Sequence, residues 1–146
     1  MPMPLPQKEL FTLPSRSRTV TVHAMDHLDP QTGKWTQKII ESIEISENLN
    51  RSALLVVRME DVSMEPVIRR QAYVGLDRDE VTVRSGEIYA LDIPGEGLVI
   101  KRVERDSAGE RLRLVSASPR HAERSLPLDC PGYVVIGRVV WVIQDL

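Results

Sequence analysis

The amino-acid sequence predicts a mainly β fold, in which a curled multi-stranded sheet carries one short helical turn. Two features predict this fold class. Apolar residues either alternate with polar ones or form short runs, and residues that favour turns separate these segments. A sheet of many short strands is expected to curl on itself, because curling leaves few unprotected edges.

The chain has the size and composition of one compact domain. It has 146 residues, of which 42% are hydrophobic and 27% are charged, and a domain of this size buries roughly two-thirds of the surface of its unfolded chain. Residues 1–17 hold four prolines, which fix φ and remove backbone donors, so we expect a flexible arm there. A single domain is expected over residues 18–146.

The strands follow from the apolar pattern. Residues 36–45 are ambiguous, since their isoleucines fit one face of a helix, but their β-branched content favours a strand. Residues 54–59 are almost continuously apolar, which indicates a strand covered on both faces. Turn-forming residues at 29–33, 94–97 and 106–109 separate strands. The predicted strands are residues 19–24, 36–45, 54–59, 72–76, 86–93, 98–104, 111–116 and 133–143.

Charge and element pattern both argue against direct contact with DNA. The formal net charge is −2, whereas proteins that bind nucleic acid usually carry a basic excess that neutralises phosphates. Residues 1–50 show no pair of helices joined by a short turn, which a reader of the major groove needs. We expect this chain to act on DNA only through a separate or removed amino-terminal domain.

Neither a metal, a cofactor nor a membrane is expected. Cys130 is the single cysteine, so an intrachain disulfide is excluded, and we interpret it as a small structural thiol. His23 and His27 would lie together only on a helix, whereas residues 19–24 alternate like a strand. No apolar stretch approaches the ~20 residues that span a bilayer, and a signal-peptide core is missing. A cytoplasmic protein is expected.

Ser63 stands in the segment EDVSMEPVI, directly after an apolar run. One interpretation is a helix cap, since Glu65 and Pro66 are favourable in a first helical turn. The other is a nucleophile, which requires an activating group because a serine hydroxyl is weakly nucleophilic. His121 is a possible base, but it lies in a turn-rich loop with no acid placed to orient it.

Lys101 is the better candidate for the base. Alternation along residues 98–103 places Val99, Lys101 and Val103 on one face of a strand. Burial among aliphatic groups disfavours the ammonium, and a neutral amine near Ser63 could take the hydroxyl proton. The competing interpretation is a lysine whose amine reaches solvent from the edge of the strand.

Four segments together resemble a known family: SMEP at 63–66, GEIYAL at 86–91, GLVIKRV at 97–103 and LRLVSASP at 112–119. In this order they are similar to the carboxy-terminal domain of the LexA and phage CI repressors, which the UmuD mutagenesis proteins share. The resemblance covers about residues 38–146 and implies a fold like that of LexA and signal peptidase.

The resemblance also implies a site. Ser63 resembles the nucleophile and Lys101 the general base of a Ser-Lys dyad that cuts the protein's own chain. The backbone near Val62 and Ser63 resembles the oxyanion hole, where amide donors stabilise the developing negative charge. No metal or cofactor takes part in this chemistry.

Two departures from the family pattern bear on activity. The family usually has Gly-Asp directly before the serine, where this chain has Asp61 and Val62. Cleaved members carry Ala-Gly or Cys-Gly upstream of the serine, and residues 22–33 contain no such pair. Either the chain keeps the dyad without cutting itself, or it cuts a different bond, for which Ala24-Met25 is the nearest small-residue candidate.

Two related functions follow from the resemblance. The first is the regulatory and dimerisation domain of a phage-type transcriptional repressor, bacterial or prophage-encoded, which forms a homodimer and has a RecA-type coprotease as a further partner. The alternative is a UmuD-like accessory subunit of a translesion DNA polymerase in the SOS response. A signal-peptidase-like enzyme would need a membrane anchor. The apolar segment 133–146 is either part of a subunit interface or a buried central strand.

Overall fold

The computed structural model describes residues 16–106, 108, 110–128 and 132–146. Most of the predicted arm and Cys130 therefore lie outside the described residues. The described chain forms a nine-stranded sheet with the strand order β2-β1-β3-β4-β9-β5-β6-β7-β8. The elements are β1 (Ser17–Ala24), β2 (Ile39–Ser46), the 3-10 helix η1 (Glu47–Leu49), β3 (Leu54–Arg58), β4 (Tyr73–Asp77), β5 (Glu87–Ile93), β6 (Gly97–Arg105), β7 (Arg111–Val115), β8 (Arg124–Pro127) and β9 (Val134–Ile143).

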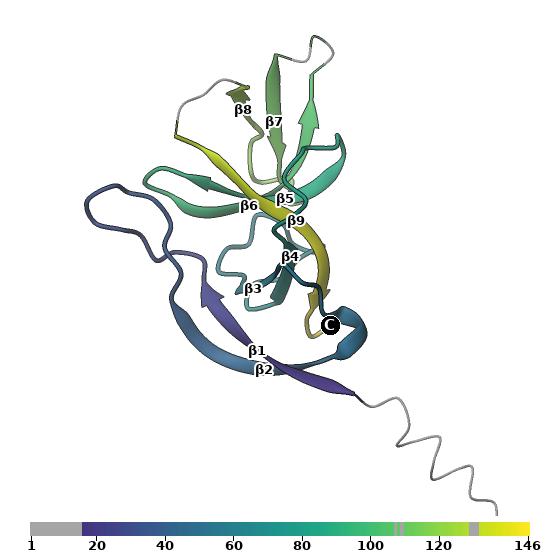
Figure 1. The fold of residues 1–146 in the computed structure, drawn as a ribbon. Coiled ribbons are helices and arrows are strands. Elements are labelled where there is room, and N and C mark those ends of the chain that lie inside the picture. The colour runs from purple at the N-terminus through teal and green to yellow at the C-terminus, as the bar shows by residue number, and fades with distance from the viewer. Residues whose placement is uncertain (1–15, 107, 109, 129–131) are drawn as a thin grey trace, which may run out of the picture.

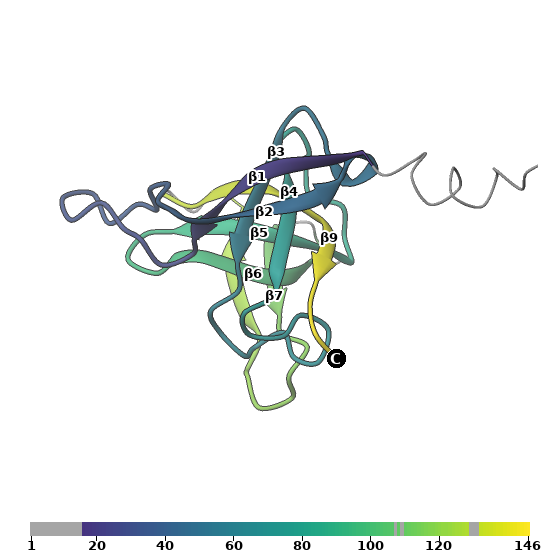
Figure 2. The ribbon, with the colours of Figure 1, turned by 90° about the horizontal axis from the view of Figure 1, so that it is seen from below.

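The sheet is curled, as the sequence predicts. The β1–β2 hairpin lies at one end of the molecule and β7 and β8 lie at the other, with β3, β4 and β9 between them (Figure 1). Seen from below, the hairpin crosses β3 and β4 (Figure 2). Register shifts interrupt the pairing of β9 with β4 at Gly75/Leu76 and with β5 at Ala90/Leu91. Such irregularities bend a strand and increase its twist, so they let one sheet wrap around the core.

The strand predictions are largely confirmed, and three details differ. Sequence analysis missed β8 and the 3-10 helix η1. The segment that begins at Ser63 forms hydrogen-bonded turns in place of the predicted helical turn, with Glu65 N–H donating to Val62 O at 3.1 Å and Ile68 N–H donating to Met64 O at 2.9 Å.

Two apolar clusters form the core, and β5 and β6 contribute to both. The first cluster comprises the buried residues Met25, Trp35, Leu55, Val57, Met59, Met64, Ile68, Ala72, Val74, Leu76, Ala90, Leu98 and Ile100. The second comprises Tyr89, Leu91, Ile93, Val103, Leu112, Leu114 and Leu126, with Val99 packed against it. Along β6, Leu98 and Ile100 therefore face the first cluster, while Val99 and Val103 face the second. This alternation places Lys101 on the side of the second cluster.

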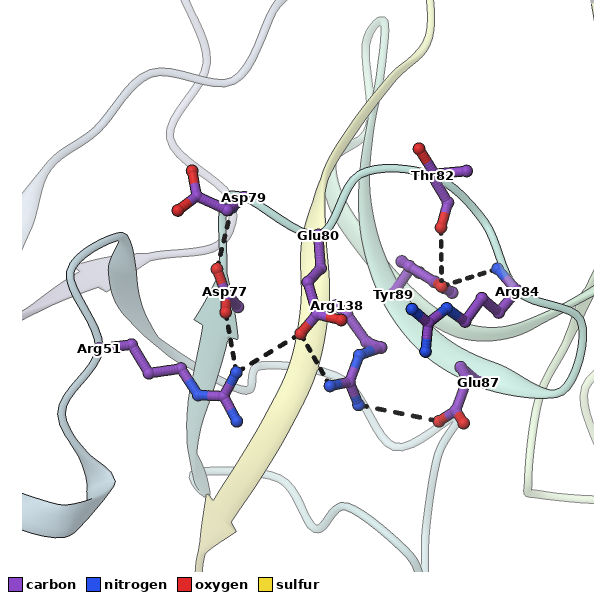
Figure 3. A network of polar contacts seen from close by, with 9 residues as sticks. All are labelled: Arg51, Asp77, Asp79, Glu80, Thr82, Arg84, Glu87, Tyr89 and Arg138. Carbon is purple, nitrogen blue, oxygen red and sulfur yellow. Dashed lines mark hydrogen bonds and ion pairs between the residues drawn. The ribbon is translucent and has the colours of Figure 1, made fainter.

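A polar network fixes β9 between its neighbours (Figure 3). Arg138 on β9 lies opposite Asp77 of β4 and Tyr89 of β5. Its guanidinium donates to Glu80 at 2.8 Å, and Arg51 donates to Asp77 at 2.8 Å. The hydrogen bond from Arg51 lowers the pKa of Asp77, and the bond to Glu80 raises the pKa of Arg138. Opposite charges on neighbouring segments thus hold the central strand in register.

Candidate active site

Ser63 lies in the turn that follows β3, and the first apolar cluster anchors this turn. The serine is only 3% exposed, and Met64 and Ile68 are fully buried. Its carbonyl accepts the backbone N–H of Ser118 at 2.9 Å, which ties the turn to the loop after β7. The direction of the serine side chain is therefore set by the core on one side and by this loop on the other.

Lys101 reaches Ser63 from the middle of β6. Its Nζ donates a hydrogen bond to Ser63 Oγ, which joins two residues 38 positions apart in the chain. A second bond runs from Lys101 Nζ to Ser116 Oγ at 2.9 Å. The structure therefore brings together the two residues that sequence analysis selected as nucleophile and base, and it does not leave Lys101 as a side chain extended into solvent.

Ser116 is a site residue that sequence analysis missed. In the antiparallel pairing of β6 with β7, Arg102 lies opposite Val115. Because the strands are antiparallel, Lys101, one residue before Arg102, lies across from Ser116, one residue after Val115. The hydroxyl of Ser116 fixes the amine beside Ser63, and only the strand register reveals it.

The environment of Lys101 lowers the pKa of its ammonium. Burial is the main cause, since it disfavours the charged form. The charges of Asp61 and Glu96 oppose this shift, and the charge of Arg124 adds to it. A larger fraction of neutral amine is thus available at a given pH than for a lysine in water, which is what a general base requires.

Asp61 is the second site residue that sequence analysis did not assign. Its Oδ1 accepts the backbone N–H of Ser63 at 3.0 Å and the Ser63 hydroxyl at 2.8 Å. An Asp side chain that binds the backbone two residues on is a common turn device, so the Asp61-Val62-Ser63 sequence carried a usable signal. The Ser63 hydroxyl does not cap a helix: it bonds to Lys101 and Asp61 instead.

The two backbone amides expected at the oxyanion hole differ in their hydrogen bonding. Ser63 N–H is taken by Asp61 Oδ1. Val62 N–H has no acceptor within the part of the chain that the structure describes, and Val62 is 42% exposed. The Val62 amide is therefore unpaired among the described residues, whereas the Ser63 amide becomes available only if Asp61 turns away.

A cleft lies beside the dyad on the side of Lys101, and Ser63 itself is not among its lining residues. Its lining residues are Asp61, Glu96, Leu98, Val99, Lys101, Leu114, Ser116, His121, Ala122 and Arg124. His121 lines this cleft, but among the described residues its side chain makes no hydrogen bond to Ser63 or Lys101, so the structure gives no support to a serine triad.

The Ala24-Met25 bond is held inside the fold. Ala24 is 7% and Met25 is 3% exposed. The carbonyl of Ala24 accepts the indole N–H of Trp35 at 2.8 Å, and the carbonyl of Met25 accepts Leu98 N–H at 2.9 Å. A peptide bond that is buried and hydrogen-bonded in this way cannot enter the cleft unless the segment leaves its place on β6.

Comparison with protein families agrees with this geometry. The Peptidase S24-like family matches residues 30–140. The chain belongs to the peptidase S24-like family. This is the family of LexA, UmuD and the carboxy-terminal domains of phage repressors, so the resemblance noted in the sequence is confirmed. No curated protein matches the chain.

Among the described residues, no group of three or more His, Cys, Asp or Glu could hold a metal ion. None of the described segments forms a helix long and apolar enough to cross a membrane.

We expect Lys101 to lose its proton with a midpoint below 10.5, the ordinary value for lysine, because burial lowers its pKa. The measurement is an NMR titration of protein labelled with carbon-13 at the ε carbon of lysine, with Lys101→Arg used to assign the signal. A midpoint at or above 10.5 would contradict the effect of burial described above.

Substitution of Ser116 tests whether its hydroxyl positions the amine. Ser116→Ala removes one of two hydrogen bonds of Lys101 Nζ, and a bond to a charged group is worth enough to slow attack by Ser63 on the order of tenfold. The rate is measured with a fluorophosphonate, which reacts with activated serine hydroxyls. Ser42→Ala, which removes an exposed hydroxyl on β2, is the control. Equal rates in both variants would rule out a positioning role for Ser116.

Proposed function

We propose that this domain is the regulatory and dimerisation domain of a phage-type transcriptional repressor, with a Ser-Lys dyad that can attack a peptide bond. The observation that carries the proposal is the Ser63–Lys101–Ser116 arrangement, in which a half-buried lysine is bonded to a buried serine hydroxyl. Membership of the S24-like family supports the peptidase chemistry. The repressor role rests on the sequence of residues 63–78, which resembles that of repressors more than that of UmuD proteins.

The chemistry follows from the positions of the groups. Neutral Lys101 accepts the proton of the Ser63 hydroxyl as Oγ forms a bond to the carbonyl carbon of the scissile peptide. The amide of Val62 donates to the oxygen that becomes negative. Lys101 then returns the proton to the leaving amine, and an acyl ester remains on Ser63. Water, activated by the neutral lysine, hydrolyses that ester.

The bond that is attacked is not Ala24-Met25 in the folded chain. Both residues are buried, and the carbonyl of Ala24 is bound to Trp35. This supports the view that the domain keeps a working dyad while its own candidate bond stays out of reach. We infer that the attacked bond belongs to a segment outside the packed fold or to another copy of the chain.

DNA contact is proposed to come from a separate domain. The part of the chain that the structure describes holds a single 3-10 helix of three residues, and this offers no recognition helix for the major groove. A UmuD-like accessory role is the alternative with the same fold. The neighbouring genes distinguish the two, since polymerase genes favour the UmuD-like role and phage genes the repressor.

We further propose that a second copy of the domain covers β9. This strand is central in the sheet, between β4 and β5, yet most of its side chains are only half-buried. Val134 and Ile143 are 47% and 38% exposed. A long apolar strand that remains partly exposed fits a symmetric interface between two identical subunits.

Dimerisation is tested by light scattering over a range of protein concentrations. A dimer is expected, and Ile143→Lys is expected to weaken it because a charge would be buried at the interface. Val81→Lys, at an apolar residue that is 46% exposed and lies outside β9, serves as the control. A monomer at every concentration contradicts the interface.

The dyad is tested by fluorophosphonate labelling between neutral and alkaline pH, with mass spectrometry to locate the label and detect fragments. Labelling of Ser63 is expected to increase with pH, because the lysine must be neutral. Lys101→Ala should reduce the rate by about two to four orders of magnitude, the usual contribution of a general base. Ser63→Ala is the control for labelling at other residues.

Two outcomes of that experiment would go against the proposal. If folded protein is not labelled at Ser63 at any pH, the dyad does not activate the serine. If a fragment from cleavage at Ala24-Met25 accumulates in the wild type but not in Ser63→Ala, the buried bond is accessible after all.

A further inference from the structure

We propose that Asp61 restrains this site: its carboxylate competes with Lys101 for the proton of the Ser63 hydroxyl and holds the dyad in a resting arrangement. The proposal rests on the proposed function, because it assumes that Lys101 is the base. Asp61 is thereby a positioning residue that acts through Ser63.

The single proton of the Ser63 hydroxyl determines which hydrogen bond it can donate. A serine hydroxyl carries one proton and can therefore donate one hydrogen bond. In the structure Lys101 Nζ donates to Ser63 Oγ, and Ser63 Oγ donates to Asp61 Oδ1 at 2.8 Å. This polarity is the reverse of the catalytic one, in which the hydroxyl must donate to a neutral amine. With Asp61 in place, the serine proton points away from its base.

Asp61 also occupies one amide of the oxyanion hole. Its Oδ1 accepts Ser63 N–H at 3.0 Å, so this donor is not free for a substrate carbonyl. A carboxylate at this position would also repel the negative charge that develops on the carbonyl oxygen during attack. Efficient attack therefore requires Asp61 to move, and its exposed position on a turn allows this movement.

The charges around Lys101 lead to the same conclusion. The charged or titratable groups of the cleft are Asp61, Glu96, Arg124 and His121. Glu96 is paired with Arg124 by two bonds of 2.6 and 3.0 Å, so much of its effect on the lysine is offset. Asp61 has no ion-pair partner among the described residues, and its charge favours the ammonium form of Lys101.

Asp61→Asn tests the restraint with little change in shape. Asn keeps an oxygen that can accept Ser63 N–H, but it removes the charge and is a weaker acceptor for the hydroxyl. Glu60→Gln removes the same charge one residue earlier and is the matched control. Near-ultraviolet circular dichroism verifies that each variant is folded.

Two readouts are compared across these proteins: the NMR midpoint of Lys101 and the pH profile of fluorophosphonate labelling. In the labelling reaction Ser63 Oγ bonds to phosphorus, fluoride leaves and the serine proton passes to Lys101 Nζ. For Asp61→Asn the midpoint is expected to fall by about half a unit to one unit, and labelling at neutral pH to increase about threefold to tenfold. Glu60→Gln should match the wild type in both.

Asp61→Gly separates the two effects of the carboxylate. It removes both the charge and the acceptor for Ser63 N–H, so the oxyanion donor is freed as well. We expect the titration midpoint of Lys101 to be similar in Asp61→Gly and Asp61→Asn. The maximal labelling rate at alkaline pH should be higher in Asp61→Gly than in Asp61→Asn.

The outcomes distinguish this proposal from the proposed function. Slower labelling of Asp61→Asn, or a midpoint and profile equal to those of the wild type, would overturn the restraint. If no protein is labelled although all are folded, the proposed function fails, and the NMR midpoint alone still decides whether Asp61 acts on Lys101.

Discussion

The hydrogen bond between Lys101 and Ser63 is the contact on which the rest of the site depends. It joins a strand to a turn that is distant in the sequence, and residues of the first apolar cluster anchor both of them. Met64 anchors the serine turn in the first apolar cluster, while Val99 and Val103 fix the lysine strand against the second. Because β6 packs into both clusters, its position relative to the serine turn is fixed, and one hydroxyl and one amine are held together.

Burial has two opposite consequences at this site. It lowers the pKa of Lys101 and so favours the neutral base. It also strengthens the influence of any nearby charge, because less water screens it. Asp61 and Glu96 therefore affect the lysine more than they would at an open surface, and the pairing of Glu96 with Arg124 leaves Asp61 as the charge that matters. The environment that makes Lys101 a better base thus also strengthens the opposing effect of Asp61.

Local patterns predicted most of the fold, while features that depend on strand pairing were missed. Alternation along β6 correctly placed Lys101 with Val99 and Val103. The strand β8 was missed because only one of its four side chains, Leu126, is buried, which leaves little periodic signal. Ser116 could not be found because its place beside Lys101 depends on the register of β6 and β7. Asp61 was visible but was interpreted as a substitute for glycine, and not as an acceptor for the serine.

The two faces of the β5–β6 hairpin have a further consequence for control of the domain. Because residues of β6 pack into both clusters, a displacement of this strand would disturb the interior on both sides of the sheet. The residues directly before Ser63 are held less firmly, since Asp61 and Val62 are exposed. A molecule or segment that activates this domain can therefore act at lower energetic cost by moving Asp61 than by moving β6. Lys101 and the buried part of the turn stay in place, while the exposed residues before Ser63 are the part that can move.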